Sequence, residues 1–192
     1  MELLAQILVN GVLLGGLYAL FAAGLAISFG IMRLINIAHG DLIVFASYAM
    51  IVATSMLGIP IIPSIILVMV LISALGYAAQ RLVFNRTLGG DMLRPLLLTL
   101  GLSIVVSNSL QAVFSSDVRS VDAGPLAVAS LDLGGQVNVG VLPLLVMLVA
   151  VISIAVLQWI FARTRMGRAF RATSDDPETA SLMGVNRNHI YA

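Results

Sequence analysis

The sequence contains no cysteine and no lysine, and only 10% of its 192 residues are charged. Without cysteine there is no disulfide framework, no thiolate zinc site and no thiol nucleophile. Without lysine there is no phosphate-binding loop of the G-x-x-x-x-G-K-[ST] type, so the chain cannot itself be a P-loop ATPase. Ten arginines stand against nine acidic residues, and the formal charge of +1 gives no strong field for attracting nucleic acid.

Hydrophobic residues make up 60% of the sequence, and the mean hydropathy of +1.07 lies far outside the balance of soluble proteins. Four stretches carry no charged side chain at all: residues 3–32, 42–80, 95–116 and 133–162. A helix needs about 20 apolar residues to cross a bilayer core. The sequence therefore predicts an all-α, polytopic transmembrane helix bundle.

The stretch 42–80 is too long for one crossing, and Gly58, Pro60 and Pro63 divide it. Proline removes an amide donor and fixes φ, so one helix ends and the next begins there. Five spans are expected, near residues 3–31, 42–58, 61–82, 95–114 and 140–162. They form a transmembrane region over residues 1–162, followed by a segment outside the membrane at 163–192.

The arginines predict the orientation, because short loops rich in arginine stay in the cytoplasm. Arginines gather in the 81–94 loop and again after residue 163, whereas the 115–139 loop holds three aspartates against one arginine. This pattern places 81–94 and 163–192 in the cytoplasm and the N-terminus outside.

Polar residues interrupt the hydrophobic sequence between the first two spans, at Asn36, His39, Gly40 and Asp41. Such positions are costly in a membrane unless they face protein or water. Asn36 suits an open helix end, Gly40 suits a sharp turn, and Asp41 suits the N-terminus of the next helix. A structural cap-and-turn role and a role in gating or substrate passage both fit.

Neutral polar residues also lie inside the spans. The densest set is on the fourth span and includes Thr99, Ser103 and Asn108. These side chains either hydrogen-bond between helices or line a passage for a small polar solute.

The tail predicts a short, capped helix of about two turns. Asp176 is a typical N-cap, Pro177 suits the first helical position, Glu178 complements the helix dipole, and Gly184 is a natural stop. A helix this short is marginal in water, so it should pack against something.

The apolar residues of this helix, Ala180, Leu182 and Met183 among them, suit insertion into a cleft of a partner chain. The alternative is a surface helix that rests on its own membrane domain.

No enzymatic constellation is present in the sequence. There is no H-E-x-x-H, no G-x-S-x-G and no pair of acidic residues within the spans. We therefore expect no catalytic, cofactor-binding or metal-binding residues in this chain, which is not expected to be an enzyme.

Three segments resemble, in the same order, the permease subunits of bacterial ABC importers for branched-chain amino acids. The first is Asn10-Gly11, Gly15-Gly16-Leu17-Tyr18-Ala19-Leu20, Gly24-Leu25 and Phe29-Gly30. The second, Asn36-Ile-Ala-His39-Gly40-Asp41, is similar to the signature N-x-x-H-G-[DE]. The third, Gly167-Arg168-Ala-Phe-Arg171-Ala through Ala180-Ser181-Leu182-Met183-Gly184-Val185-Asn186, resembles the cytoplasmic "EAA" loop that docks on the ATP-hydrolysing subunit.

The resemblance implies an alternating-access importer for leucine, isoleucine or valine in the bacterial inner membrane. Its partners would be two ATP-binding subunits, a second homologous permease and a periplasmic binding protein, with ATP acting only through the partner subunits. Residues 163–192 would form the coupling loop. The expected docking residues are Asp176, Pro177, Glu178, Ala180, Ser181, Leu182, Met183 and Gly184.

Permeases of this family continue through further spans after the docking loop, so we expect the 192 residues to be an N-terminal part. The alternative functions are an ATP-independent channel or secondary transporter for a small polar solute such as urea or an amide, and a membrane assembly factor without transport.

Overall fold

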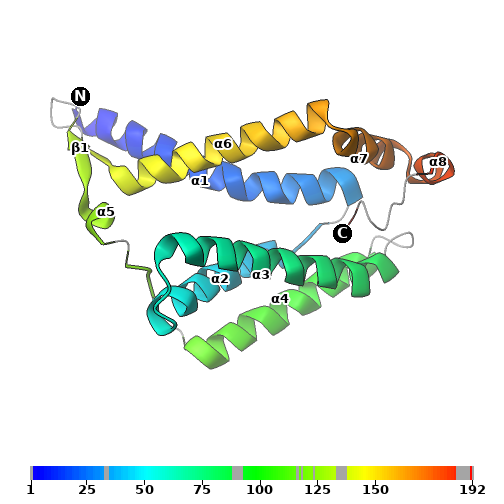
Figure 1. The fold of residues 1–192 in the computed structure, drawn as a ribbon, viewed down its shortest axis with the longest axis horizontal. Helices are drawn as coiled ribbons and strands as arrows, with labels where there is room; N and C mark the ends of the chain where they lie inside the picture. Colours follow the sequence, from blue (N-terminus) through cyan, green and yellow to red (C-terminus); the bar gives the residue numbers. More distant parts are fainter. Residues whose placement is uncertain are drawn as a thin grey trace. The chain divides into compact units, whose positions relative to one another are not determined.

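The fold was described from a computed structural model (Figure 1). It describes residues 2–32, 35–87, 93–115, 117, 119–122, 124–132, 138–184 and 191. Among these residues, five helices are long and apolar enough to cross a membrane. The prediction of an all-α polytopic membrane protein with five spans is confirmed.

The membrane-spanning helices are α1 (Glu2–Met32), α2 (His39–Ile51), α3 (Ile61–Leu82), α4 (Leu93–Phe114) and α6 (Val141–Arg163). A π-helical turn, η1 (Val52–Met56), continues α2, and a 3₁₀ turn, η2 (Phe84–Arg86), follows α3. The elements outside the spans are α5 (Pro125–Val128), β1 (Ser130–Asp132), β2 (Asn138–Gly140), α7 (Arg165–Asp175) and α8 (Pro177–Leu182).

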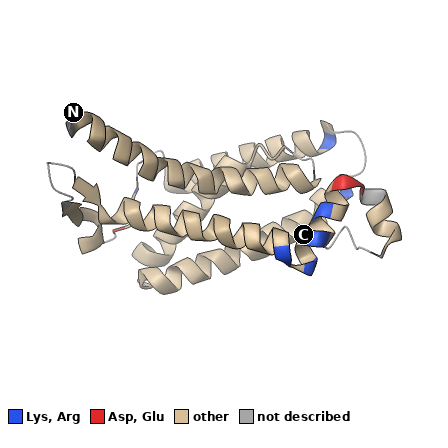
Figure 2. Ribbon diagram, turned by 90° about the horizontal axis from the view of Figure 1, so that it is seen from above, with Lys and Arg blue, Asp and Glu red and all other residues tan. Residues whose placement is uncertain are grey.

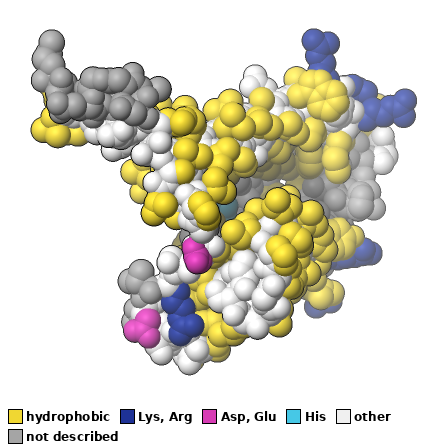
Figure 3. Space-filling view, turned by 60° about the vertical axis from the view of Figure 1, so that its left-hand side comes forward, with side chains coloured by type: hydrophobic (Ala, Val, Ile, Leu, Met, Phe, Trp, Pro, Cys, Tyr) yellow, Lys and Arg dark blue, Asp and Glu magenta, His cyan; other side chains and the backbone are white. Residues whose placement is uncertain are grey.

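Large hydrophobic side chains cover the outside of the spanning helices, as Figure 3 shows for one face. Leu3, Ile62 and Val113 are each more than 70% exposed. Exposed apolar surface on this scale is unfavourable in water and is the surface that lipid tails solvate. Figure 2 shows the complementary pattern, because the spanning helices are almost free of charged residues while several arginines lie on α7.

The chain forms two compact units. Unit 1 comprises Met1–Ala26 and Asp122–Arg168. Within it, Gly16 of α1 packs against Met147 of α6, since a Cβ atom at Gly16 would lie only 3.0 Å from the Met147 Cγ. Small residues of this kind let membrane helices approach closely.

A β-hairpin in unit 1 was not predicted from the sequence. β1 and β2 pair antiparallel with Leu131 opposite Val139. The Gln6 side chain at the start of α1 donates to the Asn138 carbonyl at 2.8 Å and accepts from the Asn138 N–H at 2.9 Å. The hairpin is therefore anchored to the beginning of the first span.

Unit 2 comprises Ile27–Val121 and Ala169–Ala192. In it, α2 contacts both α3 and α4. The turn between α2 and α3 contains Gly58 at φ +66°, and Pro60 precedes the first residue of α3. The glycine and the proline thus divide the 42–80 stretch as the sequence predicts.

Candidate functional site

The first candidate site is the segment that enters α2. Ile35 and Asn36 have no regular secondary structure, Ile37 and Ala38 form a turn, and the helix begins at His39. The His39 N–H donates to the Asn36 carbonyl at 3.3 Å.

Gly40 does not form the sharp turn expected of it. It lies inside the first turn of α2, and a Cβ atom there would meet nothing within 4 Å. The turn is made by the two residues before His39, so helix α2 starts three positions earlier than the predicted span at residue 42.

Asp41 lies in the first turn of α2, as predicted, and is half-buried. The Ser103 hydroxyl of α4, 62 positions later in the sequence, donates a hydrogen bond to the Asp41 carboxylate. A hydrogen bond to an ionised group is roughly twice as strong as one between neutral groups. This bond ties α2 to α4 at the start of the second span.

Thr99 lies one helical turn before Ser103 on α4 and is completely buried. Its hydroxyl contacts the Ile35 carbonyl at 3.3 Å and the Leu96 carbonyl at 2.9 Å. The Ile35 carbonyl belongs to the irregular segment, and no backbone N–H of the described residues donates to it. Thr99 therefore satisfies a backbone group that the break in the helix leaves open.

Asn36 is the unusual member of this cluster. Its Oδ1 atom is buried and has no hydrogen-bond partner among the described residues. A buried acceptor without a donor costs about 1 to 3 kcal/mol. Asn36, Asp41, Thr99 and Ser103 are named here the entry cluster, because they surround the entry into α2.

Asn108, another predicted site residue, takes no part in the hydrogen bonds of the entry cluster. Asn108 is exposed on α4, and its Nδ2 donates to the carbonyl of Ile104 in its own helix at 2.7 Å. His39 is half-buried at the first position of α2. The helix period explains the place of Asn108, which is about 180° around α4 from Thr99, whereas Ser103 is about 40° away.

Sequence reasoning did not single out Asn85, although it takes part in a buried polar contact. The Gln80 side chain of α3 is buried and donates to the Asn85 Oδ1 at 3.0 Å. The signal that the sequence offered was a pair of polar residues five positions apart at the end of the third span.

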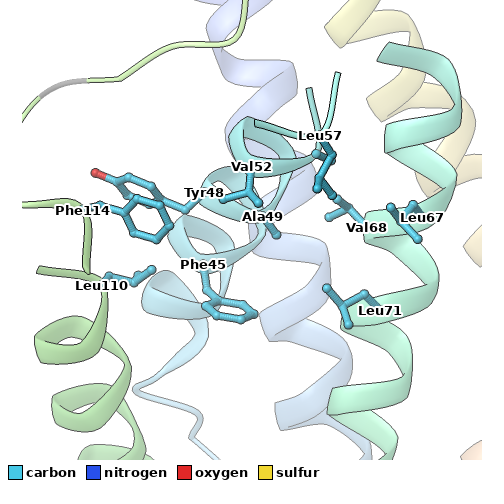
Figure 4. A pocket seen from close by; sticks show the side chains of 11 residues that line it. Phe45, Tyr48, Ala49, Val52, Leu57, Leu67, Val68, Leu71, Leu110 and Phe114 are labelled. Carbon is cyan, nitrogen blue, oxygen red and sulfur yellow. The ribbon is translucent and has the colours of Figure 1, made fainter. Parts of the chain in front are cut away.

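An apolar cavity of about 250 Å³ lies farther along α2 and α4 (Figure 4). It is lined by Phe45, Tyr48, Ala49, Val52, Ala53, Leu57, Leu67, Val68, Leu71, Leu110 and Phe114. The rings of Tyr48 and Phe114 stack with centroids 4.5 Å apart. The cavity begins about 6 to 10 Å along α2 from Asp41 and offers almost no polar surface, so it is distinct from the entry cluster.

The second candidate site is α8. The Thr179 N–H donates to the Asp176 Oδ1 at 3.1 Å, and the Thr179 hydroxyl donates to the other carboxylate oxygen. Gly184 has φ +85° and its N–H donates to the Ser181 carbonyl at 3.1 Å. The N-cap at Asp176 and the stop at Gly184 are confirmed. Pro177 and Glu178 lie in the helix, but their side chains are outside the described part of the chain, as are the residues Val185 and Asn186.

The docking residues expected on α8 differ sharply in exposure. Ala180 is buried, with 4% of its surface exposed. Leu182 and Met183 are 87% and 80% exposed. Ser181 is exposed as well and is engaged in a contact of its own. The helix is thus seated through Ala180 and presents the two large apolar side chains outward.

The described residues thus combine five apolar helices, a polar cluster at the entry into α2 and a short capped helix after the last span, which define a polytopic membrane protein. The family model described as "Branched-chain amino acid transport system / permease component" matches residues 7–191. The chain belongs to this family, and the resemblance found in the sequence is confirmed. No solved structure matches it.

Curated relatives agree with the family. The chain is 30% identical to the high-affinity branched-chain amino acid transport system permease protein BraD of Pseudomonas aeruginosa, over 97% of this chain and 64% of that protein. It is 30% identical to the permease protein LivH of Salmonella typhimurium and 29% identical to LivH of Escherichia coli K12, with the same coverage. The chain therefore spans about 64% of the length of these relatives.

Proposed function

We propose that this chain is the permease subunit of an ATP-driven importer that moves leucine, isoleucine or valine into the cytoplasm by alternating access. Membership of the permease family and the names of the relatives support the substrate class. The five apolar helices support a path across the membrane. The bacterial inner membrane is the location that this function requires.

The observation that carries the proposal is the exposure of Leu182 and Met183 at the end of α8. α8 follows the last span in the sequence, in the segment that the arginine distribution assigns to the cytoplasm, where large apolar side chains would have no lipid to cover them. The cap at Asp176 and the buried Ala180 hold the helix in place. A fixed helix with an apolar tip suits a cleft in a partner, here the ATP-binding subunit.

In this mechanism ATP binds to the partner subunits and not to this chain. Two ATP-binding subunits hydrolyse ATP and move α8, a second homologous permease completes the pathway, and a periplasmic binding protein delivers the amino acid. The orientation that follows has 81–94 and 163–192 in the cytoplasm and the N-terminus in the periplasm, which the arginine distribution supports.

The entry cluster is the proposed gate of the pathway. Asp41 and Ser103 join two spans through one hydrogen bond, and Asn36 has a buried acceptor that no described residue satisfies. A hydrogen bond between helices can be exchanged for one to a passing ammonium group or to water. Alternating access requires contacts that have two arrangements of similar energy.

The test is uptake of radiolabelled leucine by cells or proteoliposomes that contain the complete transporter, with the substitution Leu182→Asp in this chain. A carboxylate cannot be buried cheaply in a docking cleft, so we expect uptake to fall at least about tenfold while membrane insertion is unchanged. ATP hydrolysis should continue without responding to the substrate.

Val128→Asp is the matched control, because Val128 is 84% exposed on α5, far along the chain from α8. It should leave uptake unchanged. Wild-type uptake in the Leu182→Asp variant contradicts the coupling role of α8. Solute flux through this chain alone, without ATP, would instead support a channel or secondary transporter.

A further inference from the structure

Three arginines, the first three of the expected cytoplasmic segment 163–192, lie around the corner between α6 and α7. Arg163 is the last residue of α6, Arg165 is the first of α7, and Arg168 follows one turn later. All three side chains are exposed. No described residue forms an ion pair or hydrogen bond with their guanidinium groups. We name them the corner arginines.

The corner that carries them is sterically fixed. Thr164 is extended at φ −92° and ψ 161°, which ends α6, and its hydroxyl donates to the Ile160 carbonyl at 2.7 Å. The Gly167 N–H donates to the Thr164 Oγ1 at 3.1 Å. A Cβ atom at Gly167 would lie 2.3 Å from the Phe161 carbonyl oxygen, so the first turn of α7 folds tightly against the last turn of α6.

This tight corner determines where the three arginines lie. α7 cannot continue along the axis of α6 and must leave the direction in which that helix crosses the membrane. Arg163, Arg165 and Arg168 therefore lie within six residues of one another where the last apolar helix ends. Like charges three positions apart on a helix repel one another, and an anion placed among them would relieve the repulsion.

The depth of the corner in the membrane is marked by Trp159, the only tryptophan in the sequence. Trp159 lies one turn before Arg163 and is 62% exposed. Tryptophan concentrates at the level of the lipid headgroups. Since one helical turn rises about 5.4 Å, Arg163 and Arg165 lie within reach of the phosphate layer.

We propose that the corner arginines bind the phosphate of an anionic phospholipid. A guanidinium group matches a phosphate with two parallel N–H···O bonds, and three such groups at one membrane exit favour a headgroup with net negative charge over a zwitterionic one. The lipid would hold the corner against the membrane surface and so fix the base from which α7 and α8 extend.

The lone tryptophan makes the proposal testable in the whole protein. Full-length chain is reconstituted in nanodiscs that contain either brominated phosphatidylglycerol or brominated phosphatidylcholine at equal mole fraction, and quenching of Trp159 fluorescence is measured. We expect the anionic lipid to associate roughly tenfold more strongly next to Trp159. The preference should fall as NaCl is raised, because salt screens exposed charges.

In the triple variant Arg163→Gln, Arg165→Gln, Arg168→Gln, the two brominated lipids should quench Trp159 fluorescence equally. The matched control removes the same charge from the other arginine-rich loop, with Arg81→Gln, Arg86→Gln and Arg94→Gln, and should keep the wild-type preference. The salt titration of the wild-type protein provides a test that does not depend on folding of either variant.

Three results would overturn the proposal. Equal quenching by both lipids in the wild-type protein at low salt would show that no anionic lipid is preferred. A preference that persists in the corner variant would place the lipid elsewhere. Loss of the preference on adding inorganic phosphate, but not chloride of the same ionic strength, would mean that the site takes free phosphate and not a lipid.

Discussion

Asp41 and Asp176 each lie at the beginning of a helix and accept a hydrogen bond from a hydroxyl group, but the hydroxyls come from different distances. At Asp176 the donor is Thr179, three positions along the same short helix. At Asp41 the donor is Ser103, 62 positions away on another span. The first contact builds a local helix end, whereas the second determines how two membrane helices pack.

An aspartate at a helix start can therefore stabilise either its own helix, as Asp176 does, or the packing of two helices, as Asp41 does. The Asp176 cap can form in the isolated segment, and its loss would affect only α8. The Asp41 contact forms only when α2 and α4 are in register, so its loss affects the packing of unit 2. Four substitutions, in order of decreasing effect, separate the two cases.

The largest effect is expected for Ser103→Ala. It leaves the half-buried Asp41 carboxylate without its charge-assisted hydrogen bond, which is worth about 1.5 to 3 kcal/mol. The free energy of unfolding should fall by about that amount, measured by thermal or denaturant unfolding in detergent. Ser107→Ala, at an exposed position one turn farther along α4, is the control and should change stability by less than about 0.5 kcal/mol.

A double-mutant cycle sharpens this result. If Asp41 and Ser103 act as a pair, Asp41→Ala and Ser103→Ala together should cost less than the sum of the single changes, with a coupling energy of about 0.5 to 3 kcal/mol. Additive effects would mean that the hydrogen bond contributes nothing to the packing of α2 on α4.

Thr99→Val should have the next largest effect. Valine keeps the shape of the side chain but removes the hydroxyl that contacts the Ile35 carbonyl, which leaves a part-buried acceptor open at a cost of about 1 to 2 kcal/mol. Thr99→Ser keeps the hydroxyl and is the control for the hydrogen bond. Equal stability of the valine variant and the wild type would show that the Ile35 carbonyl has another donor.

Asp176→Ala should cost about 1 kcal/mol, the usual value for an N-cap, and only within α8. Hydrogen exchange measured by mass spectrometry should show faster exchange in residues 179–184 and unchanged exchange in the spans. Asp176→Asn, which retains a capping oxygen, should exchange at nearly the wild-type rate. Faster exchange across α2 or α4 would contradict the local character of this contact.

The same contrast explains which parts of the structure the sequence could predict. The five spans, the division at Gly58 and Pro60, and the ends of α8 depend on residues that are close in sequence, and each was predicted. The assignment of the turn to Gly40 was wrong. Helix α2 begins at His39, one residue before Gly40, and nothing in the local sequence distinguishes a helix that begins at His39 from one that begins after Gly40.

The pairing of Asp41 with Ser103 and of Thr99 with Ile35 could not be predicted, because it depends on the rotation and register of α2 and α4. Part of the answer was nevertheless present in the sequence. Thr99 and Ser103 are four positions apart and share one face of α4, whereas Asn108 lies on the opposite face. The helix period separates the two sets, but it does not reveal which face meets α2.

The smallest effect is expected for Thr179→Val, which removes only the hydroxyl contact to Asp176 and keeps the backbone N–H that completes the cap. Because both residues are exposed, water replaces the lost contact, and the cost should be no more than about 0.5 kcal/mol. Exchange in residues 179–184 should therefore be less affected than in Asp176→Ala. Amide exchange as fast in Thr179→Val as in Asp176→Ala would mean that the Thr179 hydroxyl, and not its backbone N–H, stabilises α8. In that case Asp176 and Asp41 would both act through a hydrogen bond from a hydroxyl side chain.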